Sequence, residues 1–132
     1  MGRTWEARVQ EYIDSPMMVQ RLRSGTLATA RIHGTTGTYR VTVDTATGVG
    51  DCTCPSPDDP CKHVAALAET FRRKRSSFVD VDRFLKGFLK DKDLEELVEI
   101  IRSMAMEAPA SLAVLGVEGV RDYVLPEEVE DW

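Results

Sequence analysis

The spacing of apolar and polar residues changes twice along the chain, and each change predicts a different kind of element. The first 25 residues have the period of amphipathic helices, and Thr4 can cap the first of them. The apolar face of that helix consists of Trp5, Val9, Tyr12 and Ile13. Ser15, a capping residue, precedes Pro16, which predicts a second short helix that runs to about Arg23 and stops at Gly25. Residues 1–25 are therefore predicted to be an N-terminal helical segment.

From residue 26 the period becomes two, as in strands that bury one face. Residues 27–33 and 38–44 are rich in β-branched side chains and alternate, while 34–37 has the glycines of a hairpin turn. The residues expected on the core face of the second strand are Tyr39, Val41 and Val43. A further turn at 44–48 leads into a short strand at 49–51. This middle part of the chain is predicted to be a β-hairpin with one added strand.

After residue 76 the apolar period is helical again. Asp80 or Asp82 can cap one helix, and Asp91 or Asp93 can cap a longer one, which Pro109 ends. The apolar stripes are Phe84, Leu85, Phe88 and Leu89 in the first helix, and Leu94, Leu97, Val98, Ile101, Met104 and Ala105 in the second. We expect the two stripes to pair as a C-terminal helical hairpin within residues 76–117. A last short helix at 112–115 can be capped by Ser111.

Residues 118–132 form an acidic tail that ends in Trp132. We expect this tail to be disordered, and the alternative is that it folds back or inserts Trp132 into another protein. The whole pattern predicts an α+β fold. Its centre is a hairpin-plus-helix region at 26–75, flanked by the N-terminal and C-terminal helical segments.

All three cysteines and one of the two histidines of the chain lie within a dozen residues, at the end of the predicted short strand. The spacing is C-x-C-x6-C-x-H, formed by Cys52, Cys54, Cys61 and His63. Thiolate and imidazole donors in this number favour a tetrahedral metal, with Zn²⁺ as the default. Side chains at i and i+2 face the same way on an extended segment but not on a helix. Cys52 and Cys54 are therefore expected on a knuckle, with Cys61 just before a helix and His63 in its first turn.

The residues after His63 support this helix, because apolar positions follow at helical spacing. They are Val64, Leu67, Ala68 and Phe71. One zinc ion per chain would then cross-link the hairpin to the helix. Its removal should unfold the half of the chain that contains the metal motif.

The cysteines could also serve two other purposes. A disulfide framework is disfavoured, because the number of cysteines is odd. A [2Fe–2S] cluster held by three Cys and one His is the sharper rival, and it would make the chain an iron–sulfur electron-transfer protein. Iron–sulfur proteins of the CDGSH type also open with C-x-C. They close with C-x3-H, however, whereas here only Lys62 separates the last two donors.

The motif, the proline after Cys54 and the Cys-Lys-His-Val-Ala-Ala run resemble the SWIM zinc finger. The resemblance covers roughly residues 25–75 and implies that Cys52, Cys54, Cys61 and His63 are the zinc ligands. Members of this family occur beside chromatin-remodelling-type helicases, in plant transposases and as partners of RecA-family recombinase paralogues. The resemblance therefore implies a protein partner of the RecA-paralogue or helicase-type ATPase class, in DNA recombination, repair or remodelling. The C-terminal layout is similar to that of some prokaryotic SWIM proteins, and we expect an archaeal source.

Charge bears on whether the chain binds DNA directly. The net charge is −5, so the strongly basic footprint of many nucleic-acid binders is absent. The densest basic run, at the end of the predicted zinc helix, is Arg72-Arg73-Lys74-Arg75. It can simply complement the negative end of the helix dipole, or it can contact phosphate. Arg31 and Arg40 would extend such a surface if their face of the hairpin lay on the same side.

The sequence offers no sign of catalysis. The four candidate ligands would close the metal sphere, and no phosphate-binding glycine loop occurs. We therefore expect no enzymatic activity and no small-molecule substrate. The chain also has no signal-peptide pattern and no apolar run of transmembrane length, so we expect an intracellular, reducing, cytoplasmic location and no membrane partner.

Overall fold

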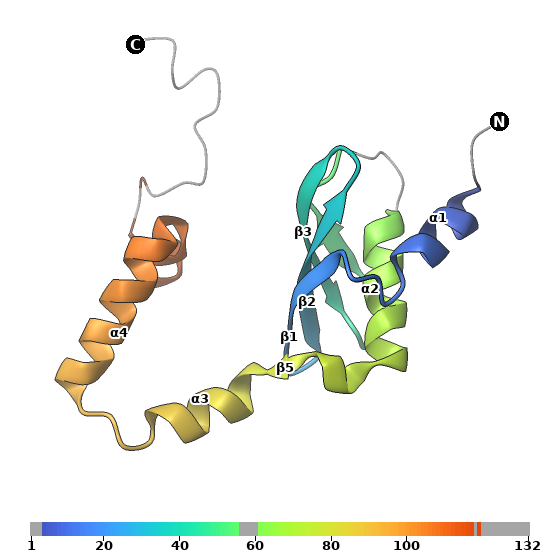
Figure 1. Cartoon of the computed structure of the whole chain (residues 1–132). Helices are drawn as coiled ribbons and strands as arrows, with labels where there is room; N and C mark the ends of the chain where they lie inside the picture. Colours follow the sequence, from blue (N-terminus) through green and yellow to red (C-terminus); the bar gives the residue numbers. More distant parts are fainter. Residues whose placement is uncertain (1–3, 56–60, 118, 120–132) are drawn as a thin grey trace, which may run out of the picture. The chain divides into compact units, whose positions relative to one another are not determined.

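Four α-helices and five strands form the part of the chain that the computed structural model describes, residues 4–55, 61–117 and 119 (Figure 1). The first half contains α1 (Trp5–Tyr12), β1 (Met18–Ser24), β2 (Leu27–Gly34), β3 (Gly37–Asp44) and β4 (Gly50–Cys52). The second half contains α2 (Lys62–Arg73), the 3₁₀ helix η1 (Arg75–Ser77), β5 (Val79–Asp80), α3 (Val81–Leu89), α4 (Leu94–Glu107) and η2 (Pro109–Leu115). The mixture of helices and strands confirms the α+β class. The chain divides into two compact units, 1–87 and 88–132.

In the first unit, the strands form one sheet in the order β4-β3-β2-β1-β5. The predicted hairpin is confirmed as β2 and β3, which pair antiparallel from Leu27↔Asp44 to Gly34↔Gly37. The short strand before the cysteines is β4, and it pairs with β3. At the other edge, β5 runs parallel to β1.

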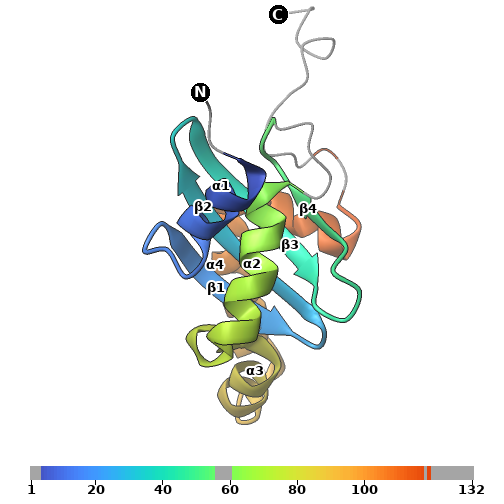
Figure 2. The same ribbon diagram turned by 90° about the vertical axis from the view of Figure 1, so that its right-hand side faces the viewer.

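One face of this sheet is covered by α2, which Figure 2 shows in front of the strands. The alternation of β2 and β3 directs small and branched apolar side chains toward α2, and α1 packs against α2 in turn. The buried apolar residues of this core are Val9, Met18, Ala28, Ala30, Ile32, Val41, Val43, Cys61, Val64, Ala66, Leu67 and Phe78. The core therefore includes one of the predicted metal ligands.

The predicted helix between Pro16 and Arg23 is wrong, because this stretch is strand β1. The strand pairs with β2, and its register shifts between Val19 and Leu22. Such a bulge breaks the two-residue alternation, so the apolar residues are spaced as they would be on a helix. Gly25, with φ of +58°, forms part of the two-residue turn between β1 and β2. The helical part of residues 1–25 is therefore α1 alone, capped by Thr4 as predicted.

The C-terminal helices begin where the aspartates predict. The Asp80 carboxylate accepts a hydrogen bond from the backbone N–H of Arg83, and Asp93 forms a capping box with Glu96 at the start of α4. The last helix is the 3₁₀ helix η2 (Pro109–Leu115), which is longer than the predicted 112–115 and has Gly116 as its C-cap. Because α3 crosses the division between the two units, its predicted pairing with α4 stays a prediction. The acidic tail lies outside the described residues apart from Gly119.

Among the helices that the structure describes, none combines the length and the apolar character needed to cross a membrane.

Candidate metal centre

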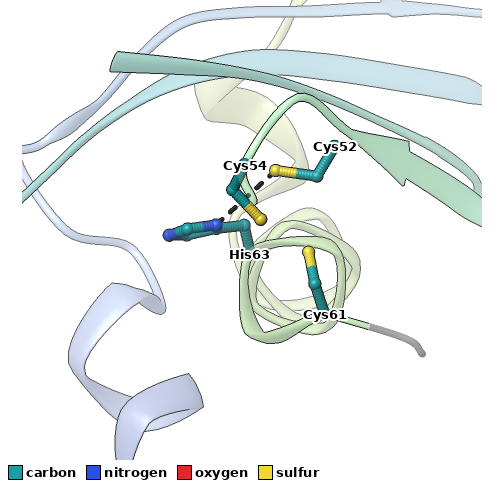
Figure 3. A group of neighbouring side chains, drawn as sticks. All are labelled: Cys52, Cys54, Cys61 and His63. Carbon is teal, nitrogen blue, oxygen red and sulfur yellow. Dashed lines mark hydrogen bonds between the residues drawn. The ribbon is translucent and has the colours of Figure 1, made fainter. Parts of the chain in front are cut away.

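The four donor side chains predicted from the sequence meet at one place, between the end of β4 and the start of α2 (Figure 3). The ligand atoms of Cys52, Cys54, Cys61 and His63 all lie within 4.8 Å of one another. Cys61 and His63 are buried, and the other two are half-buried. Residues separated by up to 11 positions in the chain thus present their donor atoms to one shared point.

The first ligand pair is positioned by the sheet. Cys52 is the last residue of β4 and pairs with Val41 of β3. Beyond it, the Thr53 N–H donates to the Arg40 carbonyl oxygen (3.1 Å), and the Arg40 N–H donates to Thr53 Oγ1 (3.0 Å). These reciprocal bonds hold the turn against β3, so that Cys52 and Cys54 face the same side, as the C-x-C spacing predicts.

The second pair is positioned by the beginning of α2. Cys61 is the N-cap, and its Sγ accepts a hydrogen bond from the Val64 N–H at 3.5 Å. His63 lies in the first turn, with its Nδ1 at 3.5 Å from Cys52 Sγ. Both positions agree with the prediction.

The donors fit a tetrahedral zinc ion. At a tetrahedral angle, bond lengths of about 2.3 Å to sulfur and about 2.0 Å to nitrogen would place a nitrogen and a sulfur ligand about 3.5 Å apart. The distance between His63 Nδ1 and Cys52 Sγ, 3.5 Å, matches this value. Nδ1 is therefore the nitrogen that faces the metal position. The bound ion would supply a cross-link between the sheet and α2.

The electrostatics of the four-donor cluster also favour a bound cation. Burial, with smaller contributions from the neighbouring thiols of Cys54 and Cys61, raises the pKa of the Cys52 thiol to about 12. Burial and the charge of Lys62 lower the pKa of His63 to about 4, so its imidazole is neutral and able to bind a metal. Negative charge at the Cys52 sulfur is thus unfavourable until a cation compensates for it.

We expect acid to weaken both zinc binding and the fold. Between about pH 6.5 and about pH 4, the unfolded chain binds a proton at His63 that the folded chain excludes, so stability falls as the pH is lowered through this range. Zinc binding displaces thiol protons, so its affinity falls in the same direction. Zinc competition titrations and thermal unfolding at stepped pH would measure both effects. A zinc affinity that is the same at pH 8 and pH 5.5 would contradict this expectation.

Comparison with known proteins agrees with this geometry. Residues 39–71 match the family model of the SWIM zinc finger. No curated protein and no solved structure matches the chain. A closed set of three cysteines and one histidine defines a structural zinc site. The matched stretch is thus similar to the SWIM zinc finger, a binding module that is not itself catalytic, and Cys52, Cys54, Cys61 and His63 are placed to hold a single zinc ion.

The residues predicted to form a basic surface are divided between two layers. Arg31 and Arg40 are paired across β2 and β3, and they alternate with the residues buried beneath α2, so they lie on the open face of the sheet. Arg72, Arg73, Lys74 and Arg75 are exposed at the end of α2, on the covered side. The continuous surface considered from the sequence is therefore not formed by these two groups.

The basic run at the end of α2 is partly neutralised from within the helix. Glu69 Oε1 accepts hydrogen bonds from Nε of Arg72 at 2.9 Å and from Nε of Arg73 at 2.8 Å. These bonds lower the pKa of Glu69 to about 2. The guanidinium of Arg75 lies over the Phe71 ring at 5.3 Å. These local contacts support the interpretation that the basic run serves the end of the helix itself.

Two aromatic contacts of the site were not anticipated from the sequence. The rings of Tyr12 and Tyr39 lie 4.8 Å and 5.4 Å from the His63 ring, measured between centroids. Both tyrosines had been assigned to apolar faces, and nothing in their spacing linked them to the metal motif. His33 is exposed and lies outside the cluster, with its Nδ1 at 2.7 Å from Thr38 Oγ1.

Proposed function

We propose that the chain is a non-enzymatic recognition module in which zinc fixes the sheet to α2, so that the surrounding surface can bind a partner. The observation that carries this proposal is the burial of Cys61 and His63 within a donor set that the protein completes by itself. Such a site leaves no coordination position for a substrate, and its contribution is to stability and shape. Three unpaired thiols also need a reducing compartment, which supports a cytoplasmic location.

The proposed partner is a DNA-acting ATPase of the RecA-paralogue or helicase type, in DNA recombination, repair or remodelling. Its support is the SWIM finger itself together with the charge of the chain. A net charge of −5, and a basic run whose Arg72 and Arg73 are already bonded to Glu69, favour a protein surface over DNA as the main ligand.

This proposal is tested by calorimetric titration of the zinc-loaded chain against the RecA-family paralogues and helicase-type ATPases of its source organism. We expect one of them to bind with a micromolar or lower Kd, and we expect chelator-treated chain to bind none. A folded, zinc-loaded chain that binds none of these ATPases would refute the proposed partner class.

A second candidate function is direct contact with DNA, and one observation favours it. Arg31 and Arg40 face each other on adjacent strands of the open face, and neither forms an ion pair with another described residue. Like charges at facing positions destabilise a sheet unless an anion compensates for them. A hollow of about 600 Å³ on this unit is lined in part by Arg40, Thr29, Thr42 and Thr53. Guanidinium and hydroxyl groups are common phosphate ligands.

Fluorescence anisotropy with single-stranded and duplex oligonucleotides separates the candidates. Direct DNA binding would weaken steeply between 50 and 200 mM salt, as counterion release requires. It would be lost in an Arg31→Glu, Arg40→Glu variant if the open face is used, and in an Arg72→Glu, Arg73→Glu variant if the end of α2 is used. Negligible DNA binding by the zinc-loaded wild type would leave the protein partner as the function.

A further inference from the structure

The imidazole of His63 is enclosed by aromatic rings. Tyr12 meets it edge-on, with 73° between the ring planes, and Tyr39 lies against it at 32°. The residue is 2% exposed, and its Nε2 is a buried atom with no hydrogen-bond partner among the described residues. Nδ1 faces Cys52, so Nε2 points away from the metal position (Figure 3).

This arrangement differs from the usual support of a metal-binding histidine. The second ring nitrogen commonly donates to a carboxylate or carbonyl oxygen, which fixes the orientation of the ring. In the described part of this chain, the packing of Tyr12 and Tyr39 takes that place. Tyr39 belongs to the stretch that matches the SWIM finger, but Tyr12 lies outside it, on α1.

A second contact fastens the end of α1 to the interior of α2. The backbone N–H of Asp14 donates to Thr70 Oγ1 at 2.8 Å, and this hydroxyl donates to the Ala66 carbonyl oxygen at 2.7 Å. Thr70 is fully buried, and Val9 of α1 is part of the same core. Thus α1 is docked at two points: on the metal ligand through Tyr12 and on the zinc helix through Thr70.

We propose that α1 stabilises the metal site by docking on it, with Tyr12 as a positioning residue for His63. The docking of α1 and the binding of zinc then strengthen each other. The two effects are reciprocal: the factor by which docked α1 increases zinc affinity is the factor by which zinc favours the docking of α1. The functional SWIM module of this chain therefore begins at α1, and loss of zinc releases this helix.

Zinc affinity, measured in the full chain by competition with a chromophoric chelator, tests the role of Tyr12. We expect Tyr12→Ala to bind zinc about tenfold more weakly, the lower end of the effect of removing the support of a metal-binding histidine. Tyr12→Phe keeps the ring and should retain wild-type affinity. Gln10→Ala, an exposed position on the same helix, should also match the wild type. Wild-type affinity in Tyr12→Ala would overturn the proposal.

Hydrogen exchange distinguishes specific release of α1 from a general loss of stability of the folded unit. At saturating zinc, we expect Tyr12→Ala to lose amide protection in α1 while residues 61–71 stay protected. Thr70→Val removes the other fastening point without touching the imidazole contact, and we expect it too to expose α1 and to weaken zinc binding. If either variant releases α1 and zinc affinity stays at the wild-type value, the coupling is absent. These readouts require no partner, so they are independent of the proposed ATPase interaction.

Discussion

A Cys61→Ala variant is expected to lose zinc and, with it, the folded state of the unit formed by residues 1–87. Cys61 is 7% exposed and is both a ligand and the N-cap of the helix that covers the sheet. Structural zinc contributes roughly 10–16 kcal/mol of apparent free energy in small zinc fingers. That is comparable to the whole stability of a typical domain, about 5–15 kcal/mol. Elemental analysis and thermal unfolding followed by circular dichroism would measure the loss.

Cys61→Ser is the matched control for this prediction. Its hydroxyl can still accept the hydrogen bond of an N-cap, whose loss alone costs only about 1 kcal/mol. If capping were the main role of Cys61, Cys61→Ser would fold and melt almost as the wild type does. We expect instead that both variants bind no zinc at stoichiometric metal. Re-addition of zinc to chelator-treated wild type should restore the fold, and a chelated wild type with an unchanged melting curve would contradict a stabilising role for the metal.

The second large effect is expected from Gly50→Ala, at the beginning of β4. A methyl group at this position would meet the carbonyl oxygen of Thr42, Val64 Cγ1 at 2.8 Å and Val43 Cα at 3.2 Å. Two backbone atoms of β3 lie on one side of the methyl group and a side-chain atom of α2 lies on the other, so the methyl group fits only if β4 moves away from β3 or from α2. Overpacking of this kind costs typically 1–3 kcal/mol. Because β4 ends at Cys52, the displacement should also weaken zinc binding.

Gly87→Ala provides the matched control. Apart from its chain neighbours and the backbone of its own helix, no atom of the described residues lies within 4 Å of the methyl group it would add, and the residue is inside α3. This change is expected to be neutral or to stabilise by up to about 1 kcal/mol, because alanine has the higher helix propensity. Thermal unfolding and chelator competition would compare both variants with the wild type. Equal melting temperatures and zinc affinities for Gly50→Ala and the wild type would show that the close packing of β4 is unnecessary.

The metal centre could be predicted from the sequence because its determinants are local. The C-x-C spacing requires an extended knuckle, and Cys61 directly precedes the apolar period that begins at Val64. The hairpin of β2 and β3 was predicted for the same reason, since alternation and turn glycines act over a few residues. In each case the spacing of neighbouring residues decides the geometry.

The features that were missed depend on residues far apart in the chain. Strand β1 is stabilised by pairing with β2. Its bulge near Gln20 gives its apolar residues the spacing that is expected for a helix. The parallel pairing of Leu22 with Val79 joins positions that no local pattern relates. The contact between Tyr12 and His63 likewise exists only once α1 has packed on α2.

The two edges of the sheet have a consequence for how a partner can be recognised. The edge strands β4 and β5 have only three and two residues. Longer edges present rows of unpaired N–H and C=O groups to which another chain can add a strand, in aggregation or in peptide binding. Each of these edge strands is too short to pair along its length with an added strand of ordinary size. The partner class proposed above would therefore be recognised through side chains on the faces of the sheet and helices.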